Sequence, residues 1–277
     1  MSKKLWEGSK QFKENSHLHA YKQWLFTNKG LEFKNYQELW QWSVTEIEDF
    51  WESIWHYFKV TSHQPYTKVL SSYEMPNSKW FEGATINYAE HLFKKAKDNE
   101  TAIIFGNETG LNQEISWLEL KTKVASLATY FKSIGVIKDD RVVAFLPNIP
   151  EATIAFLAVN SIGAIWSSTS PDFGSESVVD RFAQIEPKVL ISVDGYQYNG
   201  KPYDKSNIVN AIVDALPTLK KVLILPYLNA NALDNFPKHY ENINHIFNTV
   251  SGELTFEPVE FNHPIWVLYS SGTTGLP

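Results

Sequence analysis

Residues 165–195 read IWSSTSPDFGSESVVDRFAQIEPKVLISVDG. The apolar run at 188–193 is typical of a strand that is buried on both faces. Residues 175–185 are predicted to form a helix, which Pro187 ends because proline cannot donate the next backbone hydrogen bond. A short strand is predicted before this helix, at 164–167. Two strands joined by a helix predict a parallel pair with a right-handed crossover.

The same alternation of strands and helices extends over residues 96–277. Further strands are predicted at 101–105, 112–116, 141–146 and 221–225. Further helices are predicted from Ser116 to Ile134, at 150–161, at 206–216 and near 242–247. Ser116 and Glu119 have capping-box spacing, and Gly135 and Gly163 stand where helices should end. The pattern predicts an α/β fold with parallel β-sheets covered by helices.

The first 95 residues have a different character, because they hold most of the tryptophans. Thr45 and Glu48 have capping-box spacing at the start of a predicted helix. Its apolar residues, which recur with helical spacing, are Ile47, Phe50, Trp51, Ile54, Trp55 and Phe58. We therefore expect residues 1–95 to be an aromatic helical extension packed on the α/β body of residues 96–277.

The bulk properties exclude several classes of protein. A net charge of −6 argues against a general nucleic-acid binder, and the absence of cysteine excludes disulfides and thiolate metal sites. No apolar run is long enough for a membrane span, and no secretory signal follows Met1. The eight histidines lack metal-ligand spacing, so we expect no metal site. A cytoplasmic protein is expected.

The last residues, 265–277, read IWVLYSSGTTGLP. An apolar strand that runs into a loop rich in Ser, Thr and Gly is typical of phosphate sites. Glycines let backbone N–H groups approach the anion, and hydroxyls add donors. The P-loop pattern is not matched, because the two glycines are too close and no lysine follows them. A flexible terminal tail is the competing interpretation.

Two more loops follow predicted strands. The first, residues 170–174, is either a turn in which Asp172 or Ser175 caps the next helix, or a ligand contact at the same edge as the terminal loop. The second, residues 194–201, is either a solvated loop or a place where Lys201 meets a phosphate. The residues alone leave both alternatives open.

The terminal stretch YSSGTTGLP, residues 269–277, resembles the phosphate loop of the adenylate-forming superfamily. The stretch WFEGATINYAE, residues 80–90, resembles the branch of acetyl-CoA and acetoacetyl-CoA synthetases. The stretches WSSTSPDFG (166–174) and DRFAQIEPKVL (180–190) resemble the acetoacetyl-CoA synthetase branch in particular. The resemblance covers essentially the whole chain. It implies the N-terminal part of the large domain of an adenylate-forming enzyme.

The resemblance also implies a reaction and its site. A short keto acid would react with ATP, helped by Mg²⁺, to give an acyl-adenylate, and coenzyme A (CoA) would then take the acyl group. The residues that match the ATP phosphate loop are Ser270, Ser271, Gly272, Thr273, Thr274 and Gly275. Asp172, Phe173 and Lys201 match the CoA region, but Asp172 replaces a small residue and Tyr196 replaces an arginine of the acetyl branch. The catalytic residues are expected beyond Pro277.

Three interpretations remain open. The first is the N-terminal part of an acetoacetate–CoA ligase, with a ligase for acetate or another short acid as its variant. The second is a binding module that has this fold without catalysis. The third is an unrelated nucleotide hydrolase or transferase. Open strand edges also lead us to expect self-association of the isolated chain.

The 277-residue chain alone is expected to be inactive, because members of this family are much longer and carry their catalytic lysine downstream. ATP–pyrophosphate exchange with the purified chain measures this directly. Exchange above background with a carboxylic acid present would contradict the expectation.

Overall fold

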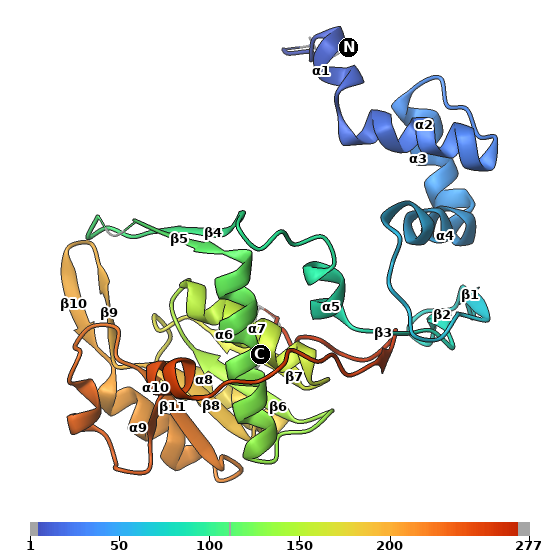
Figure 1. Ribbon diagram of the computed structural model, residues 1–277. Coiled ribbons are helices and arrows are strands. Elements are labelled where there is room, and N and C mark those ends of the chain that lie inside the picture. Colours follow the sequence, from blue (N-terminus) through green and yellow to red (C-terminus); the bar gives the residue numbers. More distant parts are fainter. Residues whose placement is uncertain (1–4, 111, 271–277) are drawn as a thin grey trace. The chain divides into compact units, whose positions relative to one another are not determined.

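The computed structural model describes residues 5–110 and 112–270. The chain divides into two compact units, Met1–Ala84 and Thr85–Pro277 (Figure 1). The division expected from the sequence, between residues 95 and 96, stays a prediction. No helix among the described residues is long and apolar enough to cross a membrane.

The first unit is mainly helical. Its elements are α1 (Lys10–Glu14), α2 (His17–Lys29), α3 (Tyr36–Thr45), α4 (Ile47–Phe58), β1 (Lys68–Leu70) and β2 (Trp80–Glu82). The buried residues Tyr21, Leu25 and Leu39 form its small core, and Trp55 stacks on Phe81 with ring centroids 4.4 Å apart. Helix and aromatic content therefore agree with the sequence prediction.

The predicted cap of α4 was wrong. Thr45 is the last residue of α3, and its hydroxyl donates to the carbonyl oxygen of Gln41 at 3.0 Å. The next residue, Glu46, occupies the N-cap position of α4 without a side-chain hydrogen bond. Asn35 does cap α3, accepting from the Glu38 N–H at 3.0 Å. Capping-box spacing alone does not show whether another helix already occupies the proposed cap.

The predicted apolar face of α4 is only partly covered. Trp55 is 8% exposed, whereas Trp51 and Phe58 are 44% and 50% exposed. The packing of this face on a larger body stays a prediction.

The second unit contains the α/β fold. Its helices are α5 (Tyr88–Phe93), α6 (Trp117–Ser133), α7 (Pro150–Ser161), α8 (Ser175–Phe182), α9 (Ser206–Ala215) and α10 (Ile243–Thr249), with 3₁₀ turns η1 (Ala183–Ile185) and η2 (Ala232–Asn235). Its strands are β3 (Thr85–Ile86), β4 (Thr101–Gly106), β5 (Asn112–Ser116), β6 (Arg141–Phe145), β7 (Ile165–Thr169), β8 (Val189–Val193), β9 (Gly195–Tyr198), β10 (Lys201–Asp204), β11 (Lys221–Leu225), β12 (Glu241–Asn242) and β13 (Val259–Glu260).

A parallel sheet with the strand order β12-β11-β8-β6-β7 forms the centre of this unit. The chain first moves outward from β6 to β7, then returns across β6 to β8 and continues outward through β11 to β12. This is a doubly wound topology, and the direction of winding reverses between β6 and β8. The predicted parallel α/β architecture is confirmed.

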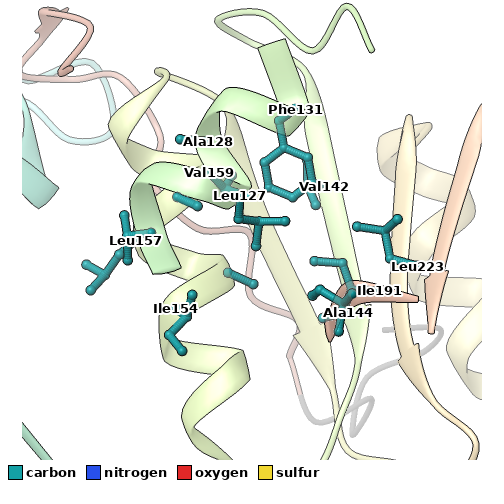
Figure 2. Packing of buried hydrophobic residues seen from close by; sticks show 14 of the residues in the cluster. Leu127, Ala128, Phe131, Val142, Ala144, Ile154, Leu157, Val159, Ile191 and Leu223 are labelled. Atoms are coloured by element: carbon teal, nitrogen blue, oxygen red, sulfur yellow. The ribbon is translucent and has the colours of Figure 1, made fainter. Parts of the chain in front are cut away.

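Both faces of the sheet are buried. Val142 and Ala144 of β6 pack with α6, α7 and α10, while Val143 and Phe145 pack with α8 and α9 on the other face. Figure 2 shows the first face, where Phe131 and Leu127 of α6 lie over the sheet. Successive residues of a strand point to opposite faces, so a strand covered on both sides must be apolar at every position.

The ends of several helices follow the sequence signals. The Ser116 hydroxyl accepts from the Glu119 N–H at 3.1 Å, which confirms the cap of α6. Helix α7 begins at Pro150, whose missing N–H costs nothing at the first helical position. Gly135 and Gly163 have φ values of 79° and 72°, a conformation that favours glycine after a helix. These boundaries are set by local chemistry.

Residues 194–201 were predicted as a loop, but the structure contains the hairpin β9–β10, which extends to Asp204. Asn199 and Gly200 form its turn with φ values of 51° and 71°. Both values are positive, as an Asn-Gly turn between antiparallel strands requires. The Glu108 carboxylate accepts from the N–H groups of Asn199 and Gly200 at 2.8 and 2.9 Å. The Asn-Gly signal and the Tyr-Gln-Tyr alternation before it were present in the sequence, but Pro202 and Asp204 are unfavourable in a strand.

Asp194 joins the base of this hairpin to the segment after β11. It is 3% exposed, and its carboxylate accepts from the N–H groups of Tyr227, Leu228 and Asn229 at 2.7, 2.9 and 2.8 Å. A buried carboxylate is stable only with such donors.

Asp194→Asn is expected to lower the free energy of unfolding by about 2 kcal/mol, because the amide NH₂ would face a backbone N–H that it cannot accept from. Urea denaturation of the chain measures the change. Asp234→Asn, at an exposed position in η2, is the matched control and should change stability by less than about 0.5 kcal/mol. Equal effects of the two substitutions would contradict the role of Asp194.

Candidate functional site

The carboxyl ends of β6, β7 and β8 lie at one edge of the parallel sheet. Ligands of doubly wound sheets bind outside this edge, where the winding reverses. The segments that leave it are residues 146–149 before α7, residues 170–174 before α8, and the hairpin β9–β10.

Residues 265–270 reach the same edge beside β7. The Trp166 N–H donates to the carbonyl oxygen of Ile265 at 3.2 Å, and the Val267 N–H donates to the carbonyl oxygen of Trp166 at 2.8 Å. The pairing is parallel but consists of a single bridge, so the strand predicted at 265–269 is present only as this contact. The Ser167 hydroxyl donates to the Val267 carbonyl oxygen at 2.9 Å and takes the place of a further backbone pair.

Ser270, the first residue of the predicted phosphate loop, is exposed at the end of this segment. The other predicted phosphate ligands lie outside the described residues: Ser271, Gly272, Thr273, Thr274 and Gly275. Their role stays a prediction.

Asp172 connects two of the segments at this edge. Its carboxylate accepts from the hydroxyls of Ser170, at 2.8 Å, and Tyr196, which belongs to β9. Neither Asp172 nor Ser175 caps α8, because Gly174 occupies the N-cap position and provides no side chain. The capping interpretation was therefore wrong. The two positions that depart from the acetyl branch, 172 and 196, are in direct contact.

This contact changes the protonation of both groups. The hydrogen bond from Tyr196, and then that from Ser170, lowers the pKa of Asp172 below its usual range. Burial, and then the bond to the Asp172 carboxylate, raises the pKa of Tyr196 to about 12. At neutral pH the pair is a charged acceptor and a neutral donor, so the bond holds the 170–174 loop against the hairpin.

The hairpin presents aromatic and basic side chains. Tyr196 stacks on Tyr203 with centroids 5.5 Å apart, and Lys205 Nζ lies 5.4 Å from the centre of the Tyr196 ring. Lys201 is exposed at the turn end of the hairpin. It precedes Tyr203 by two residues, which places it about 7 Å from Tyr203 along the strand. Lys205 is thus the cation that contacts the Asp172–Tyr196 pair, and the sequence analysis missed it. The assignment of Lys201 to CoA stays a prediction.

Phe173 points toward a second cation that the sequence analysis did not assign. The Arg181 guanidinium carbon lies 4.9 Å from the centre of the Phe173 ring and 5.9 Å from that of Tyr269. Burial raises the pKa of Tyr269, while Ser167 and Arg181 oppose this shift. Arg181 stood within the stretch that carried the family resemblance, but only the fold brings it near Tyr269.

A cavity of about 350 Å³ opens between α7, β7 and the terminal segment. Trp166, Trp266 and Phe156 form its aromatic wall, and the buried Thr169 hydroxyl has no hydrogen-bond partner among the described residues. No charged side chain lines it, so it suits an uncharged group. Its lining consists of Leu146, Pro147, Asn148, Ala152, Thr153, Phe156, Trp166, Ser168, Thr169, Ser170 and Trp266.

The side chains at this edge include two cations and two exposed aromatic rings. In the described ranges, no group of three or more His, Asp or Glu side chains could hold a metal. Arg181, Lys205 and the exposed rings of Phe173 and Tyr203 instead offer positive charge and stacking surfaces.

The chain belongs to the AMP-binding enzyme family, which matches residues 90–277. The acetyl-coenzyme A synthetase N-terminus family matches residues 36–92. The two matches meet close to the start of the α/β body.

The chain is also similar to individual proteins over its whole length. It is 38% identical to the acetoacetyl-CoA synthetase of Gallus gallus, covering 100% of this chain and 42% of that protein. It is 36% identical to the acetoacetyl-coenzyme A synthetase of Rhizobium meliloti, covering 99% and 42%. The structure of the acetoacetyl-CoA synthetase from Streptomyces lividans matches with a TM-score of 0.95 and 39% identity, covering 100% and 42%. The chain thus spans about 42% of the length of these relatives.

Tyr196→Phe is expected to raise the pKa of Asp172 toward its ordinary value, because the largest stabilisation of the carboxylate is lost while Ser170 remains. A carboxyl ¹³C NMR titration of the chain measures this pKa. Because the folded pKa is lowered, the bond stabilises the fold above the unfolded pKa, and this effect disappears as the pH falls below about 4.

Tyr198→Phe is the control, since Tyr198 is exposed on the same strand. An Asp172 pKa that is the same in the Tyr196→Phe and Tyr198→Phe variants would show that the Tyr196 bond does not form in solution.

Proposed function

We propose that this chain is the N-terminal part of an ATP-dependent acetoacetate–CoA ligase. The observation that carries the proposal is the similarity over the entire chain to acetoacetyl-CoA synthetases, at 36–39% identity. The edge of the sheet supports it, because the segment that leads to Ser270 reaches this edge, and the hairpin with Lys205 offers aromatic and basic side chains there. The proposed substrates are acetoacetate, ATP and CoA, and a cytoplasmic location stays a prediction.

In the first step, a carboxylate oxygen of the acid attacks the α-phosphorus of ATP. The bond from this phosphorus to the bridging oxygen breaks, and pyrophosphate leaves. The terminal loop, from Ser270 to Gly275, would hold the β- and γ-phosphates through backbone N–H groups and hydroxyls. Negative charge accumulates on the leaving pyrophosphate, so fixed donors accelerate the step. Mg²⁺, bound through phosphate oxygens, would supply further neutralisation.

In the second step, the CoA sulfur attacks the carbonyl carbon of the acyl-adenylate, AMP leaves and the thiol proton is lost. Asp172, Phe173 and Lys201 are the proposed CoA contacts, and Lys205 is added from its position over Tyr196. Both oxygens of the Asp172 carboxylate accept hydrogen bonds, one from Tyr196 and one from Ser170.

The alternative ligase would act on acetate or another short acid, since no residue of the described cavity distinguishes a keto group. The non-catalytic module and the hydrolase remain the other classes.

Steady-state formation of AMP by the protein expressed from its full coding sequence tests the proposal. With ATP and CoA present, kcat/KM for acetoacetate should exceed that for acetate by about 100-fold, which is the discrimination that a pocket gains from the additional carbon atoms of the larger acid. A preference for acetate would favour the alternative ligase. AMP or ADP formed without any acid would indicate a hydrolase, and no AMP with acetoacetate, acetate or a series of other short acids would indicate a module.

A further inference from the structure

Arg181 lies on the last turn of α8 with its side chain fixed on its own helix. Its Nη1 donates to the carbonyl oxygen of Ser177 at 2.7 Å and also to the Ser177 hydroxyl. Side chains on a helix lean toward its N-terminus, so this bond directs the guanidinium back toward the loop that precedes α8. The charged group is therefore held in one place.

Two aromatic rings from different segments meet at this guanidinium. Phe173 belongs to the loop between β7 and α8, and its ring centre is 4.9 Å away. Tyr269 directly precedes Ser270, and its ring centre is 5.9 Å away. Both distances are within the range of a cation–π contact. Within the described residues, no carboxylate forms an ion pair with Arg181, so the rings are its principal neighbours beyond α8.

We propose that Arg181 is a positioning residue that couples the CoA loop at Phe173 to the ATP phosphate loop after Tyr269. The inference rests on the proposed function and adds a residue to it that no sequence pattern assigned. The same cation contacts both rings, so a change at Arg181 is expected to move Phe173 and Tyr269 together. Arg181 thus affects the binding of two substrates that react in different steps.

Arg181→Met is the decisive variant, because it keeps a long apolar side chain and removes the charge. In the protein expressed from its full coding sequence, the KM for ATP in pyrophosphate exchange and the KM for CoA in thioester formation should both rise about three- to tenfold. The kcat should change by less than about twofold, since Arg181 does not touch the reacting atoms. In Arg181→Lys, both KM values should lie between those of the unaltered protein and those of Arg181→Met, because a positive charge remains.

Asp180→Asn is the control on the same turn, at an exposed position, and should leave both KM values unchanged. A rise of only one KM would overturn the coupling and indicate a direct contact with that substrate. A lower melting temperature with both KM values unchanged would reduce Arg181 to a structural role. If the unaltered protein forms no AMP, the proposed function and the coupling both fail, whereas an active protein with an unaffected Arg181→Met variant overturns the coupling alone.

Discussion

Burial of the central sheet on both faces determines the rest of the larger unit. Strands such as β8, which is buried at all five positions, must be covered by helices on both sides, and parallel strands joined by helical crossovers achieve this. All these strands then end at the same edge. The loops that leave this edge need not bury apolar surface, so they are free to carry polar and charged residues. The site follows from this division between a buried sheet and its polar edge.

Hydrogen bonds and ring contacts then organise the edge. Asp194 ties the base of the hairpin to the segment after β11, Asp172 ties the hairpin to the loop after β7, and Arg181 ties that loop to Tyr269. Each tie is made by a charged group with neutral partners. Two of these groups are carboxylates that accept hydrogen bonds, and the third is a guanidinium that lies against aromatic rings.

The accuracy of the sequence predictions depended on the range of the forces involved. Helix α7 was predicted with its observed bounds, because Pro150 and Gly163 act on the adjacent backbone. The cap at Thr45 was wrong, because α3 already occupied that residue. The hairpin β9–β10 was missed although Asn199 and Gly200 marked its turn, because its second strand is exposed at all four positions and contains Pro202. Local sequence signals thus predicted where a helix ends better than they predicted which strands pair with each other.

The sequence by itself determined the α/β class, the parallel sheet and the resemblance of the terminal loop, because these depend on residue type and short spacing. Only the tertiary structure decided that Asp172 meets Tyr196, which lies 24 residues away, and that Arg181 lies between Phe173 and Tyr269. It also decided that Lys205, rather than Lys201, contacts Tyr196. The physical reason is that these contacts join loops from different strands, and the distance between such loops is set by the order of strands in the sheet.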